Sequence, residues 1–193
     1  MKDFLQFFTF WVIFHTEYRN LEEMRTTGVS AATATANNLT HLVLGVEGSE
    51  MLAKKDLKPM SKYRNQIMNV GRKLRLHPAL IAAMISKQSN AGQQLKPDGH
   101  GMHDANSYGL MQVGVVTVSR LHLPDPPHQD RDQLEGPAAE APLCPGALVC
   151  YMVGLEKEKL EHDGELDQQT PTQDFANDVI ARAQFYAQNG FRI

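Results

Sequence analysis

The sequence contains few cysteines and few aromatic residues, and it has no excess of positive charge. Cys144 and Cys150 are its only cysteines among 193 residues, and their spacing matches neither a metal site nor a disulfide framework. We interpret them as free or incidentally paired thiols. The 19 Lys and Arg residues face 22 Asp and Glu residues, and no basic run contains interleaved aromatics. Nucleic acid is therefore not an expected partner.

Long hydrophobic runs are also missing, apart from the apolar stretch FLQFFTFWVIF at residues 4–14. This stretch is too short to span a bilayer, so we expect no transmembrane segment. It suits the centre of a secretory signal, but Asp3 weakens the preceding region and no small-residue cleavage pattern follows. We therefore interpret residues 1–17 as a weak signal peptide, an apolar extension or a misplaced start, and residues 18–193 as one domain.

The first half of this domain predicts an irregular arm followed by two helices. Residues 18–48 are rich in Thr, Ala and Asn without a sustained period, which favours irregular structure. Ser49 is predicted to cap a helix that ends at Leu57. A longer helix is predicted from Pro59 to Leu74, with a core-facing stripe at Met60, Tyr63, Ile67, Val70 and Leu74.

A central helix is predicted from Pro78 to the Asn90-Ala91-Gly92 stop. It is apolar on nearly every face, which is typical of a helix in the middle of a domain, so Gln88 is expected to emerge from the core at its C-terminal end. Residues 93–107 contain Pro97 and two glycines and predict a loop. The short apolar run at 108–113 suits a helix or a strand, and no hairpin signal stands out.

The last part of the sequence combines a proline-rich segment with further helices. Residues 124–146 hold six of the ten prolines, which excludes a compact helix and indicates an irregular insert, a disordered segment or a gene-model error. An amphipathic helix is predicted at 147–160, and Asp174 is predicted to cap a final helix over 175–188 that stops at Gly190. The fold class is thus mostly α, in a single domain with a central buried helix.

Three stretches together carry a resemblance to a known family. They are LHPALIAAMISKQSNAG at 76–92, YGLMQV at 108–113 and NDVIARAQFYAQNGF at 177–191, and weaker similarity extends the match over 18–114 and 170–191. In this order they resemble the goose-type lysozymes, which belong to the α+β lysozyme-like superfamily. The resemblance implies a secreted antibacterial protein that cleaves, with inversion, the β-1,4 bond between N-acetylmuramic acid and N-acetylglucosamine in peptidoglycan, without a cofactor.

Gln88 stands where the family motif Ile-Ser-Arg-Glu-Ser-x-Ala-Gly has its glutamate, the general acid. An amide resembles a carboxylic acid in shape but has no proton to give. Gly114 likewise replaces the aspartate that ends Met-Gln-Val-Asp in the family, and Asp104 or Asp98 matches the family's other loop aspartate. The resemblance therefore predicts a protein that binds peptidoglycan or N-acetylglucosamine oligosaccharides with hydrolysis lost or strongly reduced.

The sugar-binding residues expected from the resemblance are Tyr108, Gln112 and Asn90. The family's Ala-Tyr-Asn-x-Gly motif has no counterpart, because the sequence contains no Tyr-Asn pair and Tyr151–Gly154 aligns only loosely. One wall of the sugar site is thus altered. His100 and His103 lie near Asp98 and Asp104, but their spacing fits a solvated loop better than a metal site, and no metal is expected.

Two alternatives stay open. An active muramidase in innate defence could use Asp98 or Asp104 in place of the missing acid. A non-enzymatic product of relaxed selection, or of misread codons between Val115 and Leu166, would instead explain the proline-rich run. In each case we expect a monomer.

Overall fold

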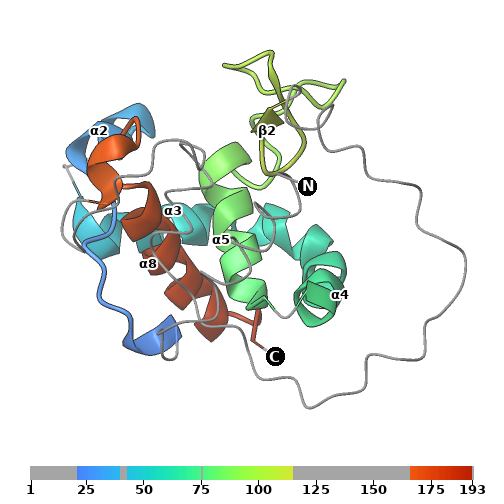
Figure 1. The fold of residues 1–193 in the computed structure, drawn as a ribbon, viewed down its shortest axis with the longest axis horizontal. Coiled ribbons are helices and arrows are strands. Elements are labelled where there is room, and N and C mark those ends of the chain that lie inside the picture. Colours follow the sequence, from blue (N-terminus) through green and yellow to red (C-terminus); the bar gives the residue numbers. More distant parts are fainter. Residues whose placement is uncertain (1–20, 40–42, 75, 115–165, 193) are drawn as a thin grey trace, which may run out of the picture.

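The computed structural model describes residues 21–39, 43–74, 76–114 and 166–192, and these form a predominantly helical structure (Figure 1). The mostly α fold expected from the sequence is confirmed. The helices and short strands are η1 (Leu21–Glu23), α2 (Ala31–Ala36), α3 (Gly45–Met60), η3 (Ser61–Tyr63), α4 (Arg64–Leu74), α5 (Pro78–Ser89), β1 (Ser107–Tyr108), β2 (Val113–Gly114), η4 (Leu166–Gln169) and α8 (Phe175–Gln188).

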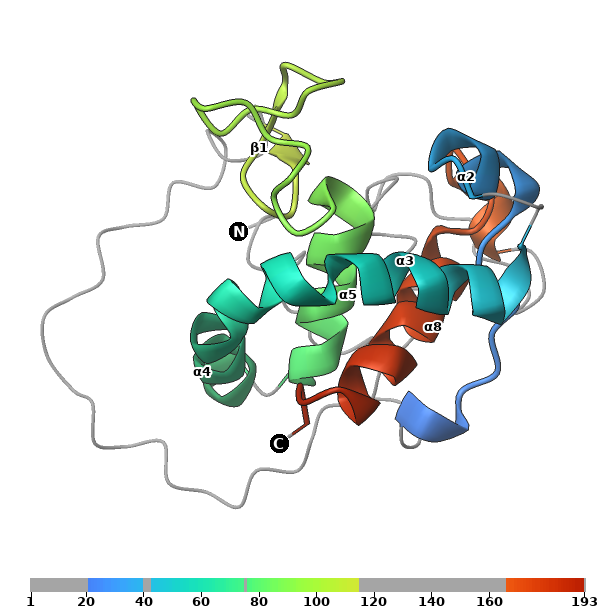
Figure 2. The ribbon, with the colours of Figure 1, turned by 180° about the vertical axis from the view of Figure 1, so that it is seen from behind.

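Helix α5 forms the centre of the structure, as its apolar sequence predicts. Its residues 78–86 are all buried, and its main neighbours are α8 and, on the other sides, α3 and α4. Figures 1 and 2, seen from opposite sides, both show α5 beside α8 with α3 crossing them. Burying one helix on every side removes most of its apolar surface from water, which stabilises the fold.

Both ends of α5 follow the signals in the sequence. Pro78 occupies the first turn, and the imidazole Nδ1 of His77 accepts the N–H of Ala79 at 3.2 Å, which satisfies one of the open donors at the helix start. At the other end Asn90 adopts a left-handed conformation with φ of 49°. Asparagine tolerates this conformation better than most residues, so the chain turns sharply out of the helix there.

The first long helix differs from the prediction at its start and in its buried face. Ser49 does not cap it, because α3 begins at Gly45 and Ser49 lies fully buried inside it. Pro59 does not start a new helix either, since it sits in the last turn of α3. Val70 and Leu74 were expected in the core, but they are 42% and 57% exposed.

Gly71 explains why α4 buries a different side from the one predicted. A Cβ atom at this position would lie 2.8 Å from the carbonyl oxygen of Leu76 and 2.9 Å from the ring of Pro78. The absence of a side chain therefore lets α4 approach the start of α5 closely along the line of Ile67 and Gly71. Val70 is consequently directed away from the core, because adjacent helical residues point about 100° apart.

A small hairpin follows α5, which the sequence analysis did not predict. Strands β1 and β2 are antiparallel, with Ser107 paired to Gly114 and Tyr108 paired to Val113. Each strand has only two residues, too few for an alternating pattern to be recognised. The connection also lacks an Asn-Gly or Asp-Gly signal, and instead places Gly109 and Gln112 at positive φ.

Helix α8 has the predicted bounds, and Asp174 is its N-cap residue as predicted, but not through its side chain. Asp174 makes no capping hydrogen bond with its side chain, which binds Lys87 and the backbone N–H of Ser30 instead. Among the residues described, no helix is long and apolar enough to cross a membrane. The predictions for residues 1–20, the cysteines, the insert at 124–146 and the helix at 147–160, including Tyr151–Gly154, lie outside the described residues.

Candidate functional site

The C-terminal end of α5 places Gln88 at the boundary between the core and the loop that follows. Gln88 is partly buried, whereas Ser86 and Ser89 beside it are fully buried. Figure 1 shows the loop and the hairpin covering this end of the helix. Gln88 thus occupies the position that the apolar helix was expected to give it.

Ser89 fastens the hairpin to this helix end. Its hydroxyl lies 2.7 Å from the carbonyl oxygen of Leu110 and 3.2 Å from that of Ile85, and its oxygen accepts the N–H of Gly92 at 3.1 Å. Gly92 is closely covered, since a Cβ atom there would lie 3.0 Å from both Leu110 and the hydroxyl of Tyr63. These contacts hold the hairpin beside Gln88.

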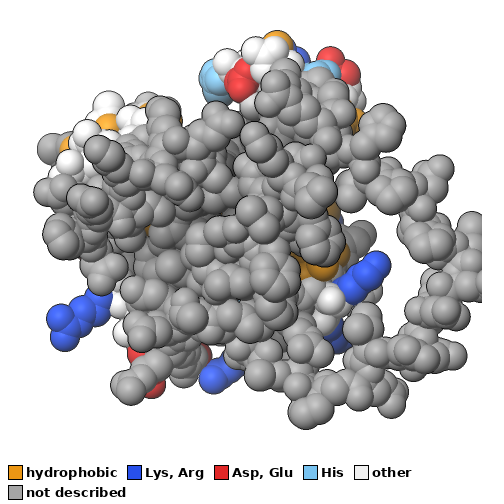
Figure 3. Space-filling view, viewed as in Figure 1, with side chains coloured by type: hydrophobic (Ala, Val, Ile, Leu, Met, Phe, Trp, Pro, Cys, Tyr) orange, Lys and Arg blue, Asp and Glu red, His pale blue; other side chains and the backbone are white. Residues whose placement is uncertain are grey.

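Asp98 and Asp104 both stabilise turns in the exposed loop. Asp98 accepts the backbone N–H of His100 at 3.1 Å. Asp104 accepts the N–H of Asn106 at 2.8 Å and the hydroxyl of Ser107. Figure 3 shows acidic and histidine side chains at the surface of this end of the molecule. No described hydrogen bond joins either aspartate to the helix that carries Gln88.

The environment of Asp104 favours its ionised form. The hydroxyl of Ser107 and, to a smaller extent, the N–H of Asn106 lower the pKa of this exposed carboxyl below its ordinary value. Both donors stabilise the carboxylate, which is the charged form. Asp104 is therefore ionised near neutral pH and poorly suited to donate a proton there.

The three predicted sugar-binding residues have different surroundings. Tyr108 is 51% exposed, and its ring meets that of His100 edge to face at 5.3 Å between centroids. The amide nitrogen of Gln112 donates to the carbonyl oxygen of Gly109 at 2.8 Å, across the hairpin turn. Asn90 serves as the C-terminal cap of α5. Tyr108 thus offers an open surface, whereas Gln112 shapes the hairpin.

Gly101 shows how tightly the loop is fitted against Gln112. A Cβ atom at Gly101 would lie only 2.0 Å from the side-chain oxygen of Gln112. A side chain at Gly101 would therefore force the amide of Gln112 to move aside. Within the described ranges, no group of three or more His, Cys, Asp and Glu side chains lies close enough to hold a metal ion.

A buried group of charged side chains supports the other side of this helix end. We call it the ion cluster, and it consists of Asp56, Lys87, Asp174, Asp178 and Arg182. The amino group of Lys87 lies 3.0 Å from Asp174 and 2.8 Å from Asp178, and Arg182 binds Asp178 at 2.8 Å. The cluster therefore joins α5 to α8 next to Gln88.

Ser86 extends the ion cluster to α3. Its hydroxyl donates to a carboxylate oxygen of Asp56 at 2.7 Å and its oxygen accepts an N–H of Arg182 at 2.9 Å. The other carboxylate oxygen of Asp56 is buried and has no hydrogen-bond partner among the described residues. Neither serine beside Gln88 thus resembles a nucleophile, because each is engaged in holding helices together.

The pKa values in the ion cluster differ in direction. Burial opposes ionisation of Asp178, but Arg182 and Lys87 outweigh it and lower its pKa to about 2. Burial also disfavours the charged form of Asp174, where Lys87 again prevails and the pKa is lowered. At Asp56 burial prevails over Ser86 and Arg182, so its pKa is raised.

The sequence analysis missed the ion cluster, although one signal was present. Asp174, Asp178 and Arg182 recur every four residues along an otherwise apolar helix, which places them on one face. Charged residues on a buried helix face need partners. The sequence alone does not identify those partners, because Asp56 and Lys87 come from distant segments.

Comparisons with known proteins agree with the fold. A family model described as "Lysozyme g" matches residues 18–134 and 138–190. The lysozyme G of Dromaius novaehollandiae is 33% identical over 197 residues, covering 90% of this chain and 89% of its own length. The lysozyme g of Casuarius casuarius is also 33% identical, covering 90% of this chain and 98% of its own length.

A human relative is similar to the same extent. The "Lysozyme g-like protein 2" of Homo sapiens is 31% identical over 192 residues, which cover 93% of this chain and 84% of its own length. The family match includes most of the stretch between the described segments, which the three motifs alone did not cover. The chain therefore belongs to the goose-type (g-type) lysozyme family.

Proposed function

We propose that this chain binds bacterial peptidoglycan or N-acetylglucosamine oligosaccharides at the C-terminal end of α5 and hydrolyses them weakly or not at all. The observation that carries the proposal is Gln88, at the family's general-acid position in the last turn of a buried helix. The hydrogen bonds of Ser89 and the ion cluster support it, because they hold this helix end in place on both sides.

The chemistry of the reaction explains the expected loss. The oxygen that leaves during cleavage of a glycosidic bond needs a proton from a neutral acid. A glutamine amide can hydrogen-bond that oxygen but cannot protonate it. General acid catalysis contributes about 10²–10⁴-fold, so the transition state would lose about 3–5 kcal/mol of stabilisation.

The base side supports the same proposal. An inverting glycosidase needs a second carboxylate to activate water. Gly114 in β2 offers none, which leaves Asp98 and Asp104 on the exposed loop as candidates. Asp104 has the ionised form that a base requires, but an ionised base does not replace the missing acid.

Glycan binding depends on different residues from catalysis. The exposed ring of Tyr108 offers a flat apolar surface against which a sugar ring can pack. We assign Asn90, at the end of the helix, and Gln112, in the hairpin, to the same site from their positions in the family motifs. Replacement of an acid by an amide of the same shape leaves these features unchanged.

Two measurements on the purified chain test the proposal. Calorimetry with an N-acetylglucosamine oligosaccharide should show binding, and Tyr108→Ala should weaken it. Clearing of a peptidoglycan suspension should be at least tenfold slower than with an active member of the family. Clearing within tenfold of that member would refute the loss of hydrolysis, and absence of binding would refute the glycan site.

A second candidate is an active antibacterial muramidase in which Asp98 or Asp104 replaces the lost acid. Both belong to the family-matched region, but both are exposed, and the lowered pKa of Asp104 argues against an acid role. If this candidate is right, Asp98→Asn or Asp104→Asn abolishes lysis. An unchanged rate in both variants excludes it.

A third candidate is a non-enzymatic chain, eroded or misread between Val115 and Leu166. The proline-rich run motivates it, and the family match across residues 115–134 and 138–165 speaks against misread codons. Transcript reads across these codons decide the matter, since uninterrupted reads in this frame exclude misreading.

We further propose that the protein acts outside the cell as a monomer. The apolar residues 4–14 support secretion, because they suit the centre of a signal peptide. Expression of the full chain in a secreting cell should release it into the medium, and light scattering should give the mass of one chain. Retention inside the cell would contradict secretion, and the mass of a dimer would contradict the monomer.

A further inference from the structure

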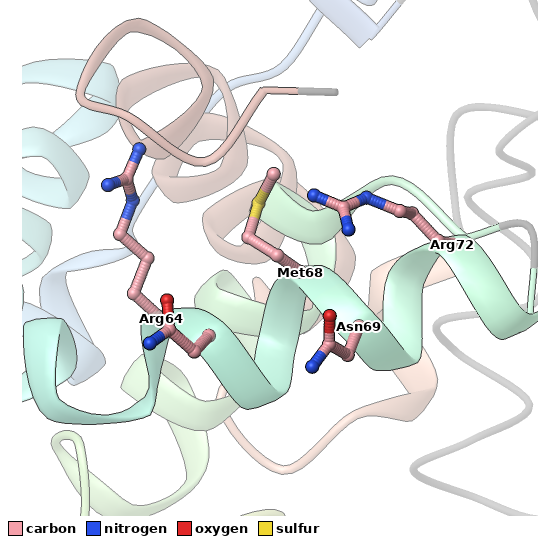
Figure 4. Close-up of a pocket in the computed structure, with 5 residues that line it drawn as sticks. Arg64, Met68, Asn69 and Arg72 are labelled. Atoms are coloured by element: carbon pink, nitrogen blue, oxygen red, sulfur yellow. The ribbon is translucent and has the colours of Figure 1, made fainter.

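Helix α4 carries a second candidate binding site, on its solvent-facing side. The site is an open hollow of about 420 Å³ lined by Arg64, Asn65, Met68, Asn69 and Arg72. Figure 4 shows the side chains of Arg64 and Arg72 on the same side of α4, with that of Met68 between them. Such a volume lies within the range of sites for small ligands.

Both arginines have donors for which the described part of the chain supplies no acceptor. The Nε–H of Arg64 donates to the carbonyl oxygen of Gly190 at 2.8 Å, and no other described group accepts from its terminal nitrogens. Arg72 is exposed, and among the described residues no carboxylate pairs with either guanidinium. A planar guanidinium binds phosphate and carboxylate groups through two parallel hydrogen bonds.

The charge of the surrounding segment points to an anionic ligand as well. Residues 57–76, which include α4, contain none of the chain's 22 acidic residues but six of its 19 basic ones. The whole chain has a net charge of −3, so this positively charged segment differs in sign from the protein as a whole. A basic surface on an acidic protein attracts anions at long range and selects them at short range.

The hollow also differs from a surface for lipid or for nucleic acid. Val70 and Leu74 are exposed, but they point to the opposite side of α4 from Arg72, given about 100° per residue. A helix that lies on a membrane needs its apolar and basic residues along one boundary. The residues that line the hollow include no aromatic ring on which a base could stack.

We propose that this hollow binds an acidic saccharide chain, that is, sugars or polyols that carry phosphate or carboxylate groups. Arg64 and Arg72 each bind one anionic group, at positions two helical turns or about 12 Å apart along α4. The amides of Asn65 and Asn69 bind hydroxyl groups between them, and Met68 contacts the apolar face of the chain.

This proposal does not depend on Gln88 or on glycan binding at the hairpin. The C-terminal end of α4 packs against Pro78 at the start of α5, and ten residues of helix, about 15 Å, separate Pro78 from Gln88. The hollow therefore adds a second contact to an anionic polymer, away from the cleavage position.

Binding of defined polymers to the full chain tests the proposal. The probes are a glycerol phosphate oligomer and an oligouronate, with a neutral N-acetylglucosamine oligomer, vesicles of anionic lipid and single-stranded DNA for comparison. We expect one or both acidic saccharides to bind more tightly than the other three probes, and to weaken as salt is raised. The stronger of the two identifies phosphate or carboxylate as the preferred group.

Matched variants locate the site. Arg72→Glu should weaken binding of the acidic saccharide at least about tenfold, because it removes a charged hydrogen-bond donor and adds repulsion. Lys73→Glu makes the same charge change one residue away, outside the hollow, and should weaken binding less than threefold. Arg72→Gln, which removes the guanidinium without adding a negative charge, should show an intermediate loss, and circular dichroism checks that each variant folds.

Three results would overturn the proposal. The first is no measurable binding of either acidic saccharide at low salt. The second is an equal loss in the Arg72 and Lys73 variants, which would show that charge acts without a site. The third is tighter binding of vesicles or DNA than of both saccharides.

Discussion

Two neighbouring residues in the last turn of α5, Lys87 and Gln88, have very different surroundings. On one side Lys87, buried among carboxylates of α8, has a complete set of partners within 3.3 Å. On the other side the next residue, Gln88, faces a loop whose carboxylates are exposed and engaged in turns. The contacts that hold this turn in place are present, while Gln88, at the proposed general-acid position, has no proton to give. The proposal thus separates folding from catalysis at adjacent residues.

Removal of the amino group of Lys87 should give the largest loss of stability. Lys87→Met retains the apolar stem but leaves the carboxylates of Asp174 and Asp178 with fewer partners in a buried site. Breaking a buried ion pair in this way costs about 3–5 kcal/mol. Urea unfolding measures the change, and Lys54→Met, at an exposed position of α3, serves as the control. Equal losses in both variants would mean that the ion cluster contributes nothing specific.

Acid should weaken the fold through Asp178. Its pKa is about 2 in the folded protein against 3.8 for the ordinary carboxyl, so its stabilising contribution is complete above pH 3.8 and is lost as the pH falls through about 2. The difference corresponds to roughly 2 kcal/mol. Asp174, whose pKa is also lowered, adds to the effect, whereas Asp56, whose pKa is raised, opposes it.

Urea unfolding at pH 6, 4, 3 and 2 measures this dependence. The free energy of unfolding should fall most steeply below pH 4, and the fall should be shallower in Lys87→Met, where the carboxylates lose a cation. A constant free energy of unfolding between pH 4 and pH 2 would contradict the assignment.

Loss of the Ser89 hydroxyl should loosen the hairpin more than the helices. Ser89→Ala leaves the carbonyl oxygen of Leu110 without its 2.7 Å donor, at a cost of about 1–2 kcal/mol. Hydrogen exchange should therefore accelerate at Gln112 and Gly109, and glycan binding should weaken. Ser61→Ala removes an exposed serine-to-backbone bond and should change neither. Unchanged exchange in the hairpin of Ser89→Ala would show that other contacts hold it.

The smallest effect is expected from replacing Asp104, which lies in the exposed loop near Gln88. Asp104→Asn keeps the shape of the turn at Asn106 and Ser107, so the free energy of unfolding should change by less than about 0.5 kcal/mol. Lysis should also stay at the wild-type level. A large loss of stability would mean that the loop carries more of the fold than its exposure suggests.

Local sequence signals predicted the elements that depend on local physics. The bounds of α5 followed from an apolar run, from Pro78 and from the stop at Asn90, and those of α8 followed from Asp174 and the stop at Gly190. The position of Gln88 at the helix end followed from the same run. These features depend on propensity and on residues within one or two turns, which a sequence displays directly.

Other features required contacts between distant segments. Asp174 is the N-cap residue of α8 as predicted, but its side chain binds Lys87, which is 87 residues away, instead of the helix N–H groups. Val70 was predicted in the core, but the close approach at Gly71 turned it outward. The hairpin was missed because two-residue strands form no pattern. In each case tertiary packing overrode a local preference, and one sequence does not show which distant residues meet.

Replacement of Gln88 by glutamate tests the central claim most directly. Gln88→Glu restores a group that can hold a proton at the end of a buried helix, and Gln88→Ala serves as a control without one. We predict that peptidoglycan clearing rises about 10²-fold or more in Gln88→Glu, with glycan binding unchanged, and that Gln88→Ala stays as inactive as the wild type. Equal clearing rates for the wild type and Gln88→Glu would contradict the claim that this amide accounts for the loss of hydrolysis.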